Sequence, residues 1–218
     1  MATYVVSGCN RGIGLELCRQ LRARDQRVIG LCRHASSALV DLGVEVVESI
    51  DVTEDASMSA LRKALADVQI DVLINNAGVL SRESLDDLDW DRMRQQFEVN
   101  SLGPLRVTHA LLEQLQHGAK VAIVTSRMGS ISESSGSYYG YRMSKAAVNM
   151  AGASLAADLR SRGIAVALLH PGMVATEMTG YQGISPEEAA GGLLERIDVL
   201  SLDASGEFWH ANGEELDW

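Results

Sequence analysis

Six short apolar runs, separated by longer segments of helical periodicity, constrain the fold of this chain more than any other feature of its sequence. The runs cover residues 3–7, 27–32, 44–49, 71–75, 120–126 and 164–170. They show little polar alternation, as is typical of strands in a sheet that is covered on both faces. The helical segments cover residues 13–24, 54–67, 91–116, 139–162 and 186–201. This alternation predicts a Rossmann fold, a doubly wound, parallel α/β sheet of about seven strands with helices on both faces.

Glycines and one capping sequence indicate where three of these helices end or begin. Gly118 and Gly163 follow two helical segments, at the position where glycine commonly ends a helix. Ser185, Pro186 and Glu188 form an N-terminal cap with proline at the first helical position. The chain has 218 residues and contains no linker, repeat or low-complexity tract. One domain spanning residues 1–218 is therefore expected.

The charge and the cysteines argue against several classes of partner. Asp and Glu number 29 against 19 Lys and Arg, and the formal net charge of −10 disfavours binding to nucleic acid or anionic membranes. Cys9, Cys18 and Cys32 form no C-x-x-C pair, so neither a disulfide framework nor a metal site is expected. The sequence has no basic leader and no apolar segment of membrane-spanning length. It therefore predicts a soluble protein of the cytoplasm.

A glycine-rich turn follows the first apolar run directly. The sequence SGCNRGIG places Gly8, Gly12 and Gly14 between the first expected strand and the first expected helix. Glycines at this point let backbone amides approach a pyrophosphate, and the N-terminus of the helix favours its negative charge. The spacing differs from the common G-x-G-x-x-G fingerprint. Its place after the first strand nevertheless favours dinucleotide binding over a purely structural turn.

The end of the second run predicts which dinucleotide binds. A site specific for NAD usually has an acidic residue there to accept hydrogen bonds from the ribose hydroxyls. This chain has Arg33 instead, and Arg11 lies within the glycine turn. Two guanidinium groups can hold a 2′-phosphate, so the sequence predicts NADP(H). The alternative is that both arginines are solvated surface residues.

The sequence SYYGYRMSK contains a tyrosine and a lysine at helical spacing. Tyr141 and Lys145 are four residues apart and therefore project from one face of a helix, whereas neither Tyr138 nor Tyr139 has a lysine at that offset. A nearby ammonium is expected to lower the pKa of the phenol from its ordinary value of about 10. As a neutral phenol, Tyr141 can give its proton to a carbonyl oxygen while hydride reaches the carbon.

Two further polar residues are candidates for the same site. Ser126 ends the fifth apolar run and should point into the ligand crevice, with Ser130 and Ser132 as alternatives. A serine at a strand end is also a common turn residue. Asn100 lies within the helical segment 91–116, where a buried asparagine can equally satisfy backbone groups.

With these residues in place, the chain resembles the classical short-chain dehydrogenase/reductase family over nearly its whole length. SGCNRGIG is similar to the family's T-G-x-x-x-G-x-G turn, with Ser7 in place of threonine, and Asn75 to Gly78 match its N-N-A-G motif. HPGMVATEM resembles its P-G-x-V-x-T segment. Within the family, the chain is similar to the C-factor and Sniffer-like carbonyl reductase branch. The resemblance implies the following cofactor-binding residues: Gly8, Asn10, Arg11, Gly12, Ile13, Gly14, Arg33, Asp51, Val52, Asn76, Ala77, Gly78, Tyr141, Lys145, Pro171, Gly172, Val174 and Thr176.

The resemblance also implies a catalytic tetrad of Asn100, Ser126, Tyr141 and Lys145. It implies an NADP(H)-dependent oxidoreductase that acts on a small aldehyde, ketone or quinone, or on the corresponding alcohol, and that forms a homo-oligomer. An alternative is an NADP(H)-binding regulatory or signalling protein with little turnover. A sugar-nucleotide epimerase also uses a tyrosine and a lysine four apart, but it needs a larger substrate region than 218 residues supply.

Three late segments leave alternatives open. Met173, Met178 and Tyr181 either line a short substrate lid or pack against the core. His170 is expected to be structural, at the end of a strand. The aromatic residues of the tail either close the core or cover a partner subunit; they are Phe208, Trp209 and Trp218.

Overall fold

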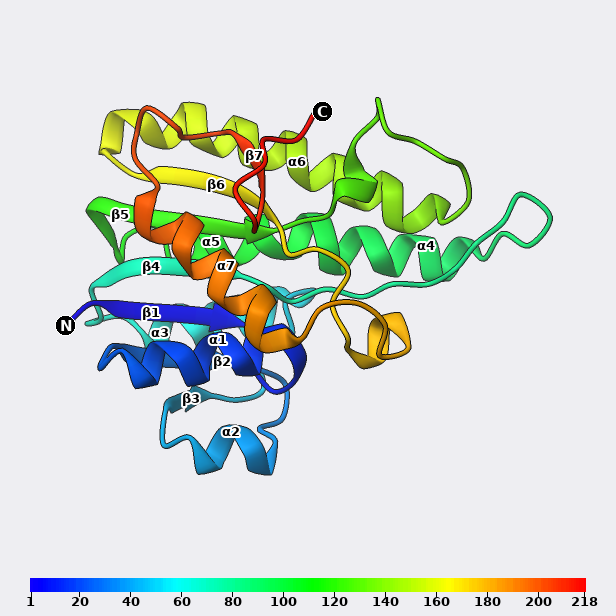
Figure 1. Cartoon of the computed structure of the whole chain (residues 1–218). Helices are drawn as coiled ribbons and strands as arrows, with labels where there is room; N and C mark the ends of the chain where they lie inside the picture. Colours follow the sequence, from blue (N-terminus) through cyan, green and yellow to red (C-terminus); the bar gives the residue numbers. More distant parts are fainter.

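The computed structural model describes residues 1–218 and contains one sheet of seven parallel strands in the order β3-β2-β1-β4-β5-β6-β7 (Figure 1). The predicted Rossmann fold is therefore confirmed. The strands are β1 Thr3–Ser7, β2 Arg27–Leu31, β3 Glu45–Val47, β4 Ile70–Asn75, β5 Leu115–Val124, β6 Ala165–His170 and β7 Phe208–His210.

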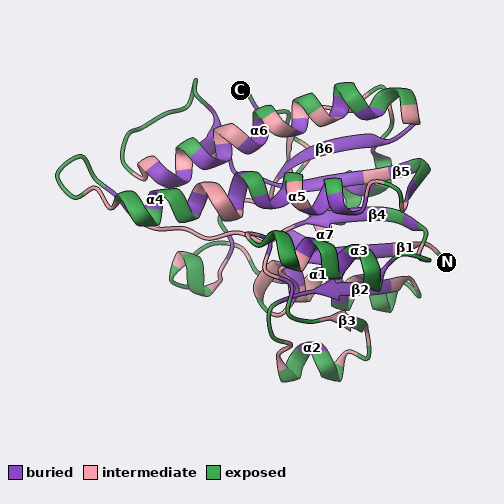
Figure 2. Cartoon of the chain, turned by 180° about the vertical axis from the view of Figure 1, so that it is seen from behind, coloured by how far each residue is buried: buried purple, intermediate pink, exposed green.

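Helices cover both faces of this sheet. The buried residues of α3, α5 and α6 share one core with the sheet, and those of α1, α2 and α7 share the other. Figures 1 and 2 show these two layers from opposite sides. The α-helices are α1 Gly12–Ala23, α2 Ser37–Asp41, α3 Asp55–Ala64, α4 Trp90–Phe97, α5 Gly103–Ala110, α6 Tyr139–Leu159 and α7 Pro186–Val199.

The apolar runs supply both cores because successive residues of a strand point to opposite faces. In β1, Val5 belongs to the core beneath α3 and α5, whereas Val6 belongs to the core beneath α1 and α7. Both side chains are fully buried. A strand that is buried on both faces is apolar at most positions, which is why these runs show little polar alternation.

The two central strands position the site. The sheet order reverses between β1 and β4, which pair in parallel from Tyr4 and Val72 onwards. In doubly wound sheets, ligands bind in the crevice outside the carboxyl ends of the strands at such a point. Ser7 ends β1 and Asn75 ends β4, so the segments that follow these residues border the crevice.

The predicted helix over residues 91–116 is wrong in its length and continuity. The structure divides it into α4, a π-helical turn η1 over Glu98–Leu102, and α5, and β5 then begins at Leu115. The prediction of Gly118 as a helix end is also wrong, because Gly118 lies inside β5 with φ of +89°. Leucines spaced through residues 111–115 continue the helical pattern into the strand and conceal this boundary. Gly163 does end a helical segment, with φ of +71° after the 3-10 turn Arg160–Arg162.

Other boundaries differ less. The third strand is shorter than the predicted range 44–49, and α2 lies in a region where no helix was expected. The predicted cap of α7 is confirmed, since the Ser185 side chain accepts a hydrogen bond from the Glu188 N–H. In the tail, Phe208 is 1% exposed within β7, and the ring of Trp218 packs against it at 5.6 Å between centroids. Phe208 therefore closes the core.

The cysteines are all buried and free, and they are Cys9, Cys18 and Cys32. No group of three or more His, Cys, Asp or Glu side chains could hold a metal ion. None of the helices combines the length and the apolar character that crossing a bilayer requires.

Candidate active site

The glycine turn after β1 packs directly against the segment after β4. Gly8 has φ of +65°, and a Cβ atom there would lie 2.7 Å from Ala77 Cα. A Cβ atom on Gly14 would overlap the Gly8 carbonyl oxygen and lie 2.5 Å from the Asn76 side-chain amide. Only glycine fits at these two positions. The turn is thus compact enough for its backbone amides to face a ligand.

The Ser7 hydroxyl joins the turn to the N-N-A-G segment. It accepts hydrogen bonds from the backbone N–H of Asn76 at 3.1 Å and of Ala77 at 3.2 Å. The Asn76 amide in turn donates to the carbonyls of Ser7 and Gly8 at 3.2 and 3.1 Å. Because Ser7 is only 2% exposed, water cannot replace it as a partner. Its hydroxyl thereby performs a task that threonine at the same position could also perform.

The P-G-x-V-x-T segment lies beside the same turn. A Cβ atom on Gly12 would lie 3.3 Å from the Thr176 methyl group. Val174 is buried and forms a parallel bridge with Ile184, which fixes this segment. Pro171 is also buried, and Gly172 has φ of +88°. Two segments that are about 160 residues apart in the chain therefore border one crevice.

Two arginines lie at the rim of the crevice with acidic partners. Arg11 pairs with Glu177, and Arg33 lies 3.9 Å from Asp51; the arginine side chains are 73% and 72% exposed. Burial tends to raise the pKa of Asp51, but hydrogen bonds from Thr53 outweigh this and hold the pKa below its ordinary value. Both guanidinium groups are accessible.

The remaining members of the predicted cofactor set support this rim. The Asn10 carbonyl accepts a hydrogen bond from the Ser36 hydroxyl at 2.7 Å, and Ile13 is half-buried in the first turn of α1. Val52 is buried against Gly103, where a Cβ atom would lie 2.9 Å from the Val52 side chain. These contacts hold the backbone near Arg11 and Arg33 in place.

Tyr141 and Lys145 lie on one face of α6, as their spacing predicts. The Lys145 Nζ atom is 5.7 Å from the centroid of the Tyr141 ring and donates a hydrogen bond to the Val124 carbonyl at 3.0 Å. Tyr141 is 8% exposed and Lys145 is 4% exposed. Burial raises the pKa of Tyr141 to about 12, and a hydrogen bond with Ser126 acts in the opposite direction. Burial lowers the pKa of Lys145 to about 8.

The direction of the Tyr141 pKa shift differs from the prediction. The sequence suggested that the lysine would lower this pKa, whereas in the free protein the pKa lies above its ordinary value. The physical reason is that burial penalises the charged form of both groups, the phenolate as well as the ammonium. Tyr141 is therefore a neutral proton donor across the physiological range.

Ser126 lies in reach of the tyrosine, whereas its two competitors bind each other. Ser126 is 6% exposed, and its hydroxyl accepts a hydrogen bond from the Met128 N–H at 3.1 Å. The turn that follows it packs tightly on α6, since a Cβ atom on Gly129 would lie 2.7 Å from the Lys145 carbonyl carbon. The hydroxyls of Ser130 and Ser132 lie 3.0 Å apart and form a hydrogen bond.

Asn100 connects the N-N-A-G segment to α6. It lies in the π-helical turn η1, a feature that is frequent at functional sites. Its amide binds both backbone groups of Val79 at 2.8 Å and donates to the Ser144 hydroxyl at 3.0 Å. Ser144 donates in turn to the Tyr141 carbonyl at 2.8 Å. Gly78 lies between, because a Cβ atom there would be 3.4 Å from Asn100 Oδ1 and 3.8 Å from Lys145 Nζ.

Several residues of this region were not predicted from the sequence. Ser144 is fully buried between Asn100 and Tyr141, and its position three residues after Tyr141 was the available signal. His170 and His210 pack edge to face at 4.9 Å, and burial lowers the pKa of His170 to about 3. Nothing in the sequence indicates His210, because the apolar runs do not predict strand β7.

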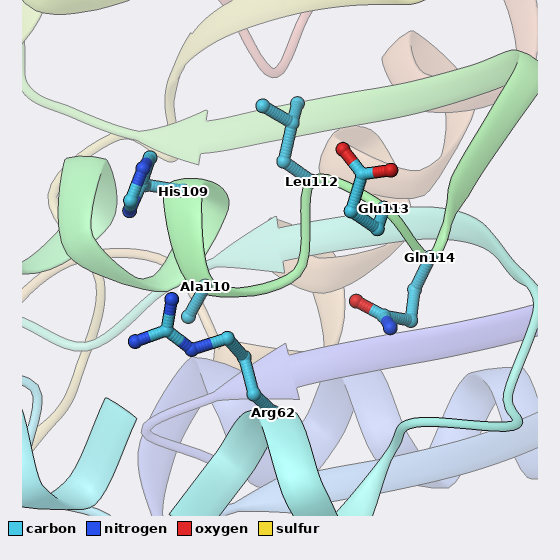
Figure 3. Close-up of a pocket in the computed structure, with 6 residues that line it drawn as sticks. All are labelled: Arg62, His109, Ala110, Leu112, Glu113 and Gln114. Carbon is cyan, nitrogen blue, oxygen red and sulfur yellow. The ribbon is translucent and has the colours of Figure 1, made fainter. Parts of the chain in front are cut away.

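A pocket of about 250 Å³ lies elsewhere, between α3, α5 and the segment that leads to β5 (Figure 3). It shares no residue with the predicted site. It is open to solvent, and two of its six lining residues are hydrophobic. The labelled residues are Arg62, His109, Ala110, Leu112, Glu113 and Gln114.

Comparison with known proteins decides the family. The model of the family described as short chain dehydrogenase matches residues 2–185. The chain belongs to the short-chain dehydrogenase/reductase family. It is 42% identical over 226 residues to 1-hydroxy-2-glutathionyl-2-methyl-3-butene dehydrogenase of Rhodococcus sp. strain AD45, covering 100% of both chains. It is 48% identical over 154 residues to C-signal of Myxococcus xanthus, covering 68% of this chain and 93% of that protein. As a member of this family, the protein is an oxidoreductase.

Solved structures of carbonyl reductases share the fold of this chain. Carbonyl reductase Sniffer of D. melanogaster superposes with a TM-score of 0.90 and 27% identity, covering 100% of both chains. The NADPH-bound carbonyl reductase from chicken fatty liver superposes with a TM-score of 0.89 and 27% identity, covering 100% of this chain and 99% of that chain. The predicted resemblance to Sniffer-like carbonyl reductases is confirmed.

Proposed function

We propose that residues 1–218 form one NADP(H)-binding domain that transfers hydride between the nicotinamide and a carbonyl or alcohol substrate. One observation carries this proposal: a buried neutral phenol, a buried amine and Ser126 lie together beside Gly78, in the N-N-A-G segment that packs on the glycine turn. A proton donor of high pKa in this place suits the reduction of a carbonyl, where the oxygen becomes negative as hydride arrives.

The residues of the crevice fit a dinucleotide. Gly8 and Gly12 have positive φ, and the turn they form precedes the N-terminus of α1, where backbone amides favour a phosphate group. Asp51 and Val52 would border the adenine, and Thr176 with Lys145 would border the nicotinamide end. When bound, NADP(H) supplies or accepts the hydride. The chicken fatty liver protein, which shares this fold, was solved with NADPH.

Arg11 and Arg33 support the choice of NADP(H) over NAD(H). Both guanidinium groups are more than 70% exposed, so they can turn toward a 2′-phosphate. Arg11 would exchange its exposed partner Glu177 for the phosphate. An exposed ion pair contributes only about 0–1 kcal/mol, so this exchange costs little.

In the proposed mechanism, Tyr141 donates its proton to the carbonyl oxygen during reduction and removes it during oxidation. Ser126 donates a hydrogen bond to the same oxygen and holds it near the phenol. The Lys145 ammonium stabilises the phenolate after proton transfer, which the low polarity of the buried site would otherwise oppose. Asn100 fixes the backbone of Val79 and, through Ser144, the carbonyl of Tyr141. It would therefore hold Tyr141 in a fixed position relative to the cofactor.

The proposed substrate is a small aldehyde, ketone or quinone, or the matching alcohol. Met173, Met178 and Tyr181 are 57%, 40% and 73% exposed, so they lie outside the core, where adaptable side chains could contact an apolar substrate. We also propose that the protein forms a homo-oligomer, as its family resemblance implies. The free cysteines support a reducing compartment such as the cytoplasm.

An NADPH-oxidation screen of carbonyl compounds tests the reductase proposal. Wild type should reduce at least one class, and Tyr141→Phe should bind NADPH with unchanged affinity but lose turnover by roughly 10²- to 10⁴-fold. NADH should bind more weakly than NADPH. Turnover by the Tyr141→Phe protein comparable to that of wild type would refute the assigned proton donor.

A regulatory role with little turnover is the second candidate function. The similarity to a protein named C-signal favours it. The same screen separates the two candidates, because a regulator should bind NADPH but reduce no carbonyl compound of the panel.

A further inference from the structure

One carboxylate of the loop between β4 and α4 is buried. Glu83 is 3% exposed, whereas Asp86 and Asp87 in the same loop are exposed. Glu83 forms no ion pair, although a buried charge ordinarily requires a partner. Figure 1 shows this loop extending beyond the first residues of α4, near the start of α6. A buried carboxylate without a cation needs other groups to stabilise it.

Three hydrogen bonds to the carboxylate replace the missing cation, and a fourth reaches the backbone of the same residue. The carboxylate accepts hydrogen bonds from the Ser81 hydroxyl, from the Gln96 amide at 3.2 Å and from the Gly140 N–H at 3.3 Å. The Glu83 carbonyl accepts the Tyr138 N–H at 2.7 Å. Glu83 therefore receives two backbone N–H groups from the start of α6.

Helix α6 has no capping side chain of its own. Tyr138, the residue before its first turn, has φ of +53° and a side chain that makes no capping hydrogen bond. The first N–H groups of a helix lack partners within the helix, and a capping side chain usually satisfies the second or third of them. Gly140 is the second residue of α6, and Glu83 supplies its partner from a segment more than fifty residues away. The negative charge also suits a helix N-terminus.

The same contacts clamp the residue beside Tyr141. A Cβ atom on Gly140 would overlap the Gln96 amide and lie 2.9 Å from Met93 Cγ, so α6 touches α4 closely here. Figure 2 shows these two helices side by side. Gln96 also accepts the Ser81 N–H at 3.1 Å. Loop, α4 and α6 thus meet at one point, immediately before the tyrosine.

We propose that Glu83 is a positioning residue for Tyr141, acting as the cap of α6 supplied by the β4–α4 loop. It holds the first turn of α6, and with it Tyr141, in a fixed position against α4 and the β4–α4 loop. This inference rests on the proposed function of Tyr141, but the cap itself does not depend on turnover.

Hydrogen exchange tests the cap without any substrate. In Glu83→Ala, the amides of residues 138–142 should exchange at least about 10-fold faster than in wild type, because the second N–H of the helix loses its partner. Peptides from residues 152–159, at the far end of α6, should exchange at wild-type rates. The matched control is Asp86→Ala, which removes an exposed carboxylate from the same loop and should leave both regions unchanged.

Kinetics tests the positioning of the tyrosine. With a carbonyl that wild type reduces, Glu83→Ala should lower kcat by about 10- to 100-fold, because small displacements of a reacting group have large effects on rate. The Kd for NADPH and the KM should stay within about twofold, since no cofactor-binding residue is altered. Glu83→Gln keeps one acceptor oxygen for Gly140 and should recover most of kcat.

Three results would overturn the proposal. One is unchanged exchange at residues 138–142 in Glu83→Ala. Another is a loss of kcat that is matched by faster exchange throughout the chain, which indicates general destabilisation. The third result concerns Glu83→Gln and decides the question if Glu83→Ala does not fold. It is exchange of residues 138–142 as slow as in wild type, together with a kcat as low as that of Tyr141→Phe. Failure of wild type to reduce any carbonyl would refute the proposed function instead, and the exchange data would still decide the cap.

Discussion

Replacing Lys145 by methionine should make the protein more stable while it removes activity. The ammonium is 4% exposed, and burial lowers its pKa from an ordinary 10.5 to about 8. At about 1.36 kcal/mol per pH unit, this change corresponds to roughly 3 kcal/mol of unfavourable ionisation in the folded protein at neutral pH. The lost hydrogen bond to the Val124 carbonyl offsets about 1 kcal/mol of the gain. Lys145→Met should therefore be more stable by about 2 kcal/mol, or roughly 4–8 °C in Tm.

The stability gain of Lys145→Met should decrease as the pH rises. A lysine whose folded pKa lies below its unfolded value destabilises the fold fully below pH 8, where both states are protonated. As pH rises from about 8 to 10.5, the folded protein loses the proton first and the penalty disappears. Urea denaturation of the free protein at pH 7 and pH 9.5 measures this. The advantage of Lys145→Met over wild type should shrink at the higher pH, and other titrating groups cancel in the difference.

Lys120 provides the matched control for this prediction. Its ammonium donates to the carbonyls of Ile197 and Asp198 at 2.7 and 2.8 Å, at the end of α7, where carbonyls lack helical partners. Burial lowers the pKa of Lys120 as well, but this side chain is only half-buried and makes two hydrogen bonds, so Lys120→Met should not share the stability gain of Lys145→Met. If Lys145→Met is no more stable than wild type at pH 7, the reasoning from burial is wrong.

Three further predictions concern the glycine turn and Arg33, which together form the proposed cofactor site. Ser7→Ala leaves the partly buried N–H groups of Asn76 and Ala77 without their partner and should lower the free energy of unfolding by roughly 1–3 kcal/mol, whereas Ser7→Thr should stay near wild type; urea melts measure both. Gly14→Ala should weaken NADPH binding at least about 10-fold in fluorescence titration, because its methyl group would displace the backbone of the turn. Arg33→Glu should reverse the preference between NADPH and NADH, and equal affinities in the wild type would contradict the assignment.

Much of the fold follows from patterns that are local in the chain. The predicted bounds of β1 and β6 agree with the structure within one residue, because each strand has an uninterrupted apolar centre and is followed by a glycine or proline. The spacing of Tyr141 and Lys145 predicts their shared face because α6 is regular through that turn. The order of the motifs then predicts that they meet, since carboxyl ends of parallel strands share one edge of the sheet.

The remaining features depend on contacts between distant segments. Among the acids of the loop before α4, nothing local distinguishes the buried Glu83 from the exposed Asp86, because its partners lie on α4 and α6. The tyrosine pKa was misjudged for a similar reason. The spacing predicted a neighbouring ammonium, but the degree of burial that dominates the pKa emerges only when the layers pack.

The π-helical turn Glu98–Leu102 has a consequence for insertions and deletions. A π-turn accommodates one residue more than the α-helix around it. Removing a single amino acid here would restore ordinary α-helical winding and leave α4 and α5 facing as they do now, so the buried Val107 would keep its place in the core. The side chains within the turn would be redistributed, and Asn100 would lose its fixed position beside Val79 and Ser144. A one-residue deletion in this segment should therefore preserve the fold and remove the polar contacts of Asn100.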